Sequence, residues 1–201
     1  MEKLTIALGI AAALVHGAAY ILYNVHAKLG KSSPNVTTWS IWALFAIINT
    51  LSYYEMSGDA VVTLQFFTGS VACIFTFFYT LTIGKFSWPG KKDWGCFFLV
   101  LIAILVWWKF ESVTGANMIF VIAFIISFIP TYIGVLRDPL KEMPMSWALW
   151  SIAYIITTTN VVLRDDGHMA LVMPFVLAIA HGSIVGLSTK SRKERVSNVR
   201  L

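Results

Sequence analysis

Residues Ile129 to Tyr154 read I-P-T-Y-I-G-V-L-R-D-P-L-K-E-M-P-M-S-W-A-L-W-S-I-A-Y, the end of one apolar segment, a short charged turn and the start of the next segment. A similar run, A-A-Y-I-L-Y-N-V-H-A-K-L-G-K-S-S-P-N-V-T-T-W-S-I-W-A-L-F-A, extends from Ala18 to Ala46. The features that the two runs share are Tyr20-Ile21 and Tyr132-Ile133, Pro34 and Pro144, and the pairs Trp39/Trp42 and Trp147/Trp150. Because duplicated helix–turn–helix units inside apolar chains are typical of transporters, we expect two copies of one structural unit.

The composition indicates a protein that is surrounded by lipid. Of the 201 residues 58% are hydrophobic and only 12% are charged, about half the charged fraction of a soluble domain. The net charge of +5 comes from turns and from the tail, without a basic stripe that contains interleaved aromatic residues, so nucleic-acid binding is not expected. The lipid bilayer is therefore the first expected partner.

The apolar sequence divides into seven segments that we expect to be membrane-spanning helices, since a bilayer core requires about 20 residues per helix. They are Leu4–Tyr23, Thr37–Tyr54, Ala60–Ile83, Trp94–Trp108, Asn117–Leu136, Trp147–Leu163 and Met169–Ser188.

The basic residues predict how these segments are oriented. With seven spans, twelve of the 15 lysines and arginines fall on one side of the membrane. By the positive-inside rule that side is cytoplasmic. The sequence therefore predicts a multi-pass protein, expected in the cell membrane, with its N-terminus outside and its C-terminus inside.

The repeat predicts a division into two three-helix bundles joined by one helix. An odd number of spans in each unit means that a single linking span gives both units the same orientation. The expected parts are residues 4–83 as the first bundle, 84–112 as the linker helix, 113–188 as the second bundle and 189–201 as a basic cytoplasmic tail. The predicted fold class is all-α, a polytopic membrane protein with seven transmembrane helices in a 3+1+3 parallel repeat.

This plan, and the motif Ile129-Pro130-Thr131-Tyr132 followed by a turn and Pro144-Met-Ser-Trp147, resemble the SWEET and PQ-loop superfamily, with threonine in place of the family's glutamine. The chain departs from the family at Ala18, where the matching proline is missing, and at Pro174-Phe175, where sugar transporters carry Pro-Asn. It also resembles bacterial nicotinamide riboside transporters, which share the 3+1+3 plan, tryptophan pairs and a Leu-Gln-rich third helix. Both resemblances imply transport of a small molecule.

Candidate solute-binding residues lie on one face of the second helix of each unit and on facing helices. Aromatic rings suit the apolar faces of sugars or the plane of a base, and amides supply directional hydrogen bonds. Polar groups within the spans should face protein or a water-filled cavity. The expected site comprises Trp42, Asn49, Gln65, Trp150, Tyr154, Thr157, Asn160 and His181. Trp39 and Trp147, which begin their helices, fit either this site or an interfacial belt.

Two further sets of residues have expected roles in the transport cycle. Pro130 and Pro174 interrupt backbone hydrogen bonding inside their helices and are candidate hinges. His16 and His181 are the only side chains in the spans that titrate near neutral pH, so they are the candidates for proton coupling. All ten acidic residues fall at helix ends or in loops, so the spans offer no counter-charge to a cation and we expect a neutral solute.

The function expected from these patterns is transport of a small neutral, sugar-like solute by alternating access, passive or weakly proton-linked. A vitamin or nucleoside-type carrier is the first alternative. A receptor of the same fold and a membrane protein without transport activity are the others. No catalytic residues, metal ligands or cofactor motifs are expected, the chain is not expected to be an enzyme, and a homo-oligomer stays open.

Overall fold

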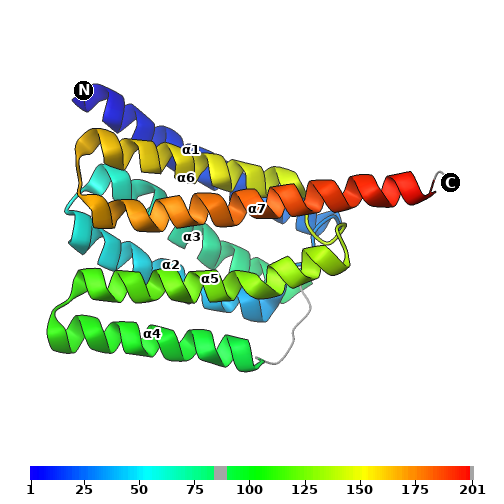
Figure 1. Cartoon of the computed structure of the whole chain (residues 1–201), viewed down its shortest axis with the longest axis horizontal. Coiled ribbons are helices and arrows are strands. Elements are labelled where there is room, and N and C mark those ends of the chain that lie inside the picture. Colours follow the sequence, from blue (N-terminus) through cyan, green and yellow to red (C-terminus); the bar gives the residue numbers. More distant parts are fainter. Residues whose placement is uncertain (84–89, 200–201) are drawn as a thin grey trace.

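The computed structural model describes residues 1–83 and 90–199, without the side chains of residues 92, 93, 96, 100 and 190–199. All regular elements in this part of the chain are α-helices, as the sequence predicts (Figure 1). They are α1 (Glu2–Lys28), α2 (Val36–Ser57), α3 (Ala60–Ile83), α4 (Lys91–Phe110), α5 (Val113–Arg137), α6 (Pro144–Arg164) and α7 (His168–Val199). Each of the seven expected segments lies within one helix or has the same bounds.

The helices extend beyond the apolar segments because capping residues, and not hydropathy, set their ends. The Asn35 side chain accepts a 3.1 Å hydrogen bond from the Thr38 N–H and starts α2. Gly58 ends α2 in the left-handed conformation, with φ of 64°. Pro144 occupies the first turn of α6, where its missing N–H costs no hydrogen bond. Helix α7 continues past Ser188, since its sequence has no proline or glycine there to stop it.

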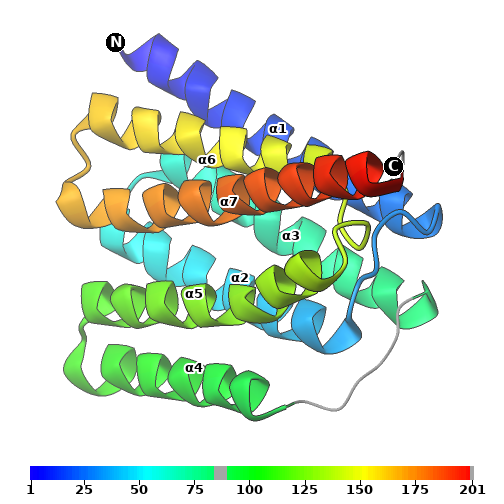
Figure 2. The ribbon, with the colours of Figure 1, turned by 45° about the vertical axis from the view of Figure 1, so that its right-hand side comes forward.

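The packing order of the helices is the same in the two halves of the chain. Helix α3 packs against both α1 and α2, and α7 packs against both α5 and α6. The halves meet where α1 packs against α6 and α2 packs against α5. Helix α4 lies outside this arrangement, mainly against α5 (Figures 1 and 2). Exchanging α1–α3 for α5–α7 leaves these contacts unchanged.

The surface of the bundle is apolar and many polar side chains are inside. Phe67, Phe75 and Phe78 of α3 are all more than half exposed, whereas Gln65 and Asn160 are fully buried. In water this distribution would be unfavourable, but it suits a bundle surrounded by hydrocarbon.

Five helices are long and apolar enough to cross a membrane, which fits an integral multi-pass membrane protein. They are α1, α3, α5, α6 and residues 168–189 of α7. Helix α2 carries more polar groups, which are buried in the bundle, and the apolar part of α4 is shorter.

The bundle has two distinct ends. One end, here the N-terminal end, carries residue 1 and the loops that precede α3, α5 and α7 (Figures 1 and 2). The other end carries the α1–α2 and α5–α6 turns and is called the turn end. The basic residues expected at the turn end include Lys85, Lys92 and those of 190–201, which lie outside the described residues or side chains.

Candidate functional site

The two Trp-x-x-Trp pairs of the repeat meet in the centre of the bundle. Trp39 and Trp42 of α2 and Trp147 and Trp150 of α6 form one cluster, with ring centroids 5.1 Å apart within each pair. Across the two halves, the Trp42 and Trp147 centroids are 6.2 Å apart and those of Trp39 and Trp150 are 6.5 Å apart. These distances are typical of favourable edge-to-face and tilted aromatic contacts. Trp39 and Trp147 are therefore packed inside the bundle and are not part of an interfacial belt.

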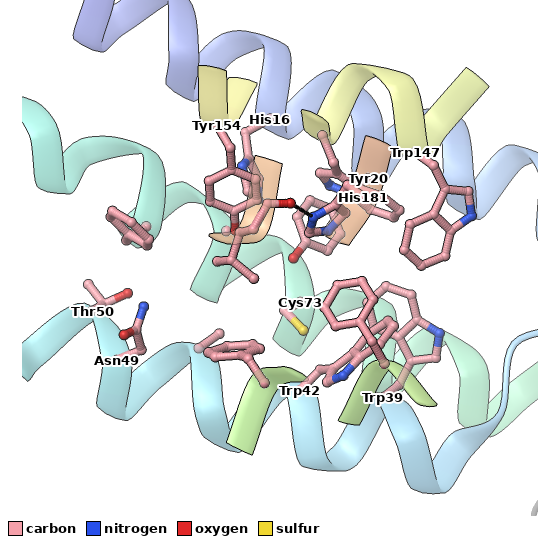
Figure 3. A pocket seen from close by; sticks show the side chains of 17 residues that line it. His16, Tyr20, Trp39, Trp42, Asn49, Thr50, Cys73, Trp147, Tyr154 and His181 are labelled. Atoms are coloured by element: carbon pink, nitrogen blue, oxygen red, sulfur yellow. Dashed lines mark hydrogen bonds between the residues drawn. The ribbon is translucent and has the colours of Figure 1, made fainter. Parts of the chain in front are cut away.

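A cavity of about 50 Å³ adjoins the N-terminal side of this cluster. Figure 3 shows its lining, which is mainly aromatic and includes Tyr20, Tyr154, His16 and His181. No charged Asp, Glu, Lys or Arg belongs to the described lining of this central cavity. Ligand pockets usually measure about 300–1,000 Å³, so in this conformation the cavity has room for water but not for a sugar or nucleoside.

A second cavity, here the vestibule, has about 500 Å³ and lies at the turn end. Its lining comes mainly from α1, α2, α5 and the two turns, with one residue each from α3 and α6, and it includes Tyr23, Pro130, Lys141 and Glu142. Three tryptophans line both the vestibule and the central cavity: Trp39, Trp42 and Trp147. We call these three side chains the tryptophan partition, because they separate the two spaces.

Polar side chains from three helices form a buried network beside the central cavity. Nε2 of Gln65 lies 2.6 Å from Nδ1 of His16, and the Thr157 hydroxyl donates to Oε1 of Gln65. A Cβ atom on Gly69 would lie 2.9 Å from Nε2 of His16, so glycine makes the space for this ring. The network joins α1, α3 and α6, and it fixes the imidazole that faces the cavity.

Other polar groups of the lining also have partners within the protein. The Trp42 indole N–H donates to the Ser127 hydroxyl at 2.9 Å, and Nδ1 of His181 lies 2.7 Å from the Leu177 carbonyl oxygen. The indole N–H of Trp150 is different, since it is buried and has no hydrogen-bond partner. A buried donor without a partner is costly, and the Trp150 side chain that carries it lines the central cavity.

An ion pair and two hydrogen bonds connect the helices at the N-terminal end. The Arg164 guanidinium at the end of α6 pairs with Asp59 at the start of α3. It also donates a 2.9 Å hydrogen bond to the Thr5 hydroxyl of α1. The Tyr53 hydroxyl of α2 donates to the Ala170 carbonyl of α7 at 2.8 Å. These contacts tie the two halves together at the end opposite the vestibule.

Glu142 is an acidic residue outside the helices, as the sequence predicts, but its side chain is buried. It lies in the α5–α6 turn, yet only 7% of it is exposed. Its carboxylate accepts hydrogen bonds from the Trp147 indole N–H at 3.2 Å and from the Tyr23 hydroxyl at 3.4 Å. Burial raises the pKa of Glu142 to about 7, despite these hydrogen bonds. Polar turn residues are usually solvated, so the sequence carried no signal for this burial.

The expected site residues fall into two groups. Those that line the central cavity are Trp42, Asn49, Trp150, Tyr154 and His181, together with His16. Gln65 and Thr157 lie behind it in the polar network, and Asn160 is fully buried with both side-chain polar atoms unpartnered. Of the two prolines, Pro130 lines the vestibule and Pro174 lies within α7.

Sequence reasoning missed several residues of this region. Tyr20 and Cys73 line the central cavity, although neither was expected there. Tyr20 could have been noticed because the repeat pairs it with Tyr132. The two tyrosines have different contacts, however, since the Tyr132 hydroxyl donates a 3.0 Å hydrogen bond to the Ala180 carbonyl of α7. Within the residues that the structure describes, no group of three His, Cys, Asp or Glu side chains is placed to hold a metal ion.

Comparison of the chain with protein-family models, with curated proteins and with solved structures finds no match. The resemblance to the SWEET and PQ-loop superfamily therefore stays a prediction from the sequence. What the fold itself defines is an all-α bundle with an apolar surface and an interior that holds polar as well as aromatic side chains.

Proposed function

We propose that this protein is a membrane transporter of a small solute that works by alternating access, with seven spans in a 3+1+3 parallel repeat. The observation that carries the proposal is the sequence of spaces along the bundle: an open vestibule, the tryptophan partition, a central cavity and a closed N-terminal end. The shared packing order of α1–α3 and α5–α7 supports the repeat. Helices α2 and α4 are then spans as well, with α4 as the linker.

In this proposal the structure corresponds to a state that is accessible from the turn end. By the positive-inside rule, the basic residues of the turns favour a cytoplasmic position for that end, with the N-terminus outside. Opening of the other end requires separation of Arg164 from Asp59 and of Tyr53 from Ala170. Rocking of the two halves would exchange the two states, with Pro130 and Pro174 as places where α5 and α7 can bend.

The lining of the central cavity supports a solute with a flat or apolar face and a hydrogen-bonding edge. Rings from Tyr20, Trp150 and Tyr154 supply the face, and Asn49 and the unpartnered Trp150 N–H supply polar contacts. The absence of charged side chains from the described lining favours a neutral solute at this point. A sugar fits this description, and a nucleoside or vitamin is the alternative.

A ligand screen followed by uptake measurements tests the proposal. Purified protein is heated in the presence of sugars, nucleosides, vitamins and amino acids, and a binder raises the melting temperature by mass action. The binder is then used in uptake assays with proteoliposomes. We expect Trp150→Ala to abolish uptake and Trp108→Ala, a 78% exposed tryptophan of α4, to leave it unchanged. Binding without uptake would instead favour a receptor, and the absence of both would leave a membrane protein without transport activity.

A further inference from the structure

Glu142 is hydrogen-bonded to Trp147, one of the three side chains of the tryptophan partition. A movement of the Trp147 ring would join the two cavities that it separates. The Oε2 atom of Glu142 accepts the N–H of Trp147, and Trp147 lines both the vestibule and the central cavity. Its Oε1 atom accepts the Tyr23 hydroxyl, which belongs to α1 in the other half of the chain. One carboxylate therefore connects the partition to both halves of the protein.

We propose that Glu142 is the proton-binding group of the carrier, and that its charged form holds Trp147 in the partition, so that proton uptake loosens the barrier between vestibule and central cavity. This inference rests on the proposed transport function and adds a coupling group to it. The sequence directed attention to His16 and His181, which line the central cavity, whereas Glu142 lies in the α5–α6 turn and lines the vestibule.

The chemical step is the addition of one proton from vestibule water to one carboxylate oxygen. A carboxylate forms hydrogen bonds about twice as strong as those of a neutral acceptor. The Tyr23 hydroxyl can reverse its role and accept a hydrogen bond from a protonated Oε1. The Trp147 indole can only donate a hydrogen bond. After protonation its acceptor is therefore an oxygen of the uncharged carboxylic acid, which is a weaker acceptor than the carboxylate. Protonation therefore weakens the attachment of Trp147 without removing a side chain from its place.

The surroundings of Glu142 allow this proton to exchange under ordinary conditions. The vestibule gives water a route to the turn, and Lys141 is the other charged residue in its described lining. Burial places the pKa of Glu142 at about 7, while Lys141 favours the charged form. Both forms are therefore populated near neutral pH. At this end of the described structure, the titratable or charged groups on α1, α5 and the two turns are Tyr23, His26, Lys28, Lys31, Arg137, Asp138 and Lys141.

Cys73 provides a native probe of the barrier, because it lines the central cavity and is 1% exposed. In a Cys96→Ser background it is the only cysteine. Its alkylation by iodoacetamide is measured in detergent from pH 5.5 to 8.5, in protein with Glu142 and in the Glu142→Gln variant. A neutral reagent is used because the charge at position 142 would change the local concentration of a charged one. The thiolate fraction rises with pH in both proteins, so the ratio of the two rates isolates the barrier.

We expect equal rates at pH 5.5 and about fivefold faster alkylation of Glu142→Gln at pH 8.5, the factor expected when a charge-assisted hydrogen bond becomes a neutral one. Trp147→Phe, which retains a ring but has no N–H, should make the rate insensitive to Glu142→Gln at every pH. Glu55→Gln, at an exposed carboxylate of α2, should match the parent protein. A ratio that stays constant with pH, or a Trp147→Phe background that preserves the effect, would overturn the proposal. Because no solute is used, this outcome is independent of whether uptake is found.

Discussion

The Nδ2 atom of Asn117 donates a 3.1 Å hydrogen bond to Oδ1 of Asn49, which links α5 to α2 across the boundary between the two halves of the chain. Asn117 is fully buried, and Asn49 also lines the central cavity. The two amides therefore differ in role: one only joins helices, and the other also faces the space proposed for solute.

A comparison of alanine variants should separate these roles. Each of Asn49→Ala and Asn117→Ala is expected to lower the free energy of unfolding by about 0.6 kcal/mol, the average for hydrogen bonds between membrane helices. The double variant should cost less than the sum, since both changes remove the same bond. Uptake should be lost in Asn49→Ala and largely retained in Asn117→Ala. Equal uptake defects in both would indicate that Asn49 acts only through its helix contact.

The unpartnered N–H of Trp150 leads to a second comparison. Trp150→Phe and Trp42→Phe remove the same number of atoms, but only Trp42 gives up a hydrogen bond, to Ser127. Thermal unfolding should therefore show Trp42→Phe to be the less stable variant, by about 1 kcal/mol. Solute affinity should change in the opposite order, with about a tenfold loss in Trp150→Phe if the free indole N–H binds solute. Unchanged affinity in that variant would remove this contact from the proposed site.

Helix positions could be predicted because lipid-facing segments require long apolar runs, and each expected segment lies within or coincides with one helix. The sequence repeat also indicated that the two Trp-x-x-Trp pairs occupy equivalent positions in the two halves. That Trp39 and Trp147 lie in the interior could not be predicted, because it depends on how α2 and α6 pack around a shared centre. Spacing along one helix specifies a face, but it does not specify which other helix that face meets.

The residues that escaped prediction depend on contacts between segments far apart in the sequence. Arg164 and Asp59 are separated by 105 positions, and Glu142 reaches Tyr23 across 119 positions. Arg164, Asp59 and Glu142 lie in loops or at a helix end, where solvent exposure is the ordinary expectation. Their burial or pairing follows from how the two halves dock, and no local pattern specifies it.

The Arg164–Asp59 pair should hold the N-terminal end closed. Asp59→Asn removes the charge but retains a side chain that can cap α3, so a change in this variant reports the ion pair and not the cap. In intact cells carrying the Cys96→Ser protein, an impermeant thiol reagent should label Cys73 about threefold faster in Asp59→Asn, in line with a partly exposed ion pair. Glu55→Gln is the matched control. Labelling at the parent rate would show that the ion pair does not limit access from this end.

Gly9 lies at a close approach of α1 to α3. A Cβ atom there would lie 2.7 Å from the Val61 carbonyl oxygen, which is backbone and cannot rotate away. Gly9→Ala should therefore separate the helices and lower the melting temperature, with a cost of about 1–3 kcal/mol. Gly186→Ala in α7 is the control, because in the described part of the chain no atom beyond its own turn of helix lies within 4 Å of the added Cβ. If both variants melt alike, the close contact at Gly9 does not contribute to stability.

Glu142 should also affect how the stability of the whole protein depends on pH. Its pKa is about 7 in the folded protein and 4.5 ordinarily, so the folded chain binds the proton more tightly than the unfolded chain does. Stability should therefore fall as the pH rises from about 4.5 to 7 and then level off. Glu142→Gln removes this contribution. The variant should match the parent protein near pH 4.5 and exceed it at pH 8 by up to about 3 kcal/mol.

The measurement is the difference in unfolding free energy between the two proteins across this pH range, because other groups that titrate in both cancel in the difference. Glu55→Gln should give a difference close to zero at every pH. A Glu142→Gln protein that is less stable than the parent at pH 8 would mean that the hydrogen bonds from Trp147 and Tyr23 outweigh the cost of burying the charge. In that case the carboxylate would remain ionised in the folded protein, and proton uptake at Glu142 could not control the partition near neutral pH.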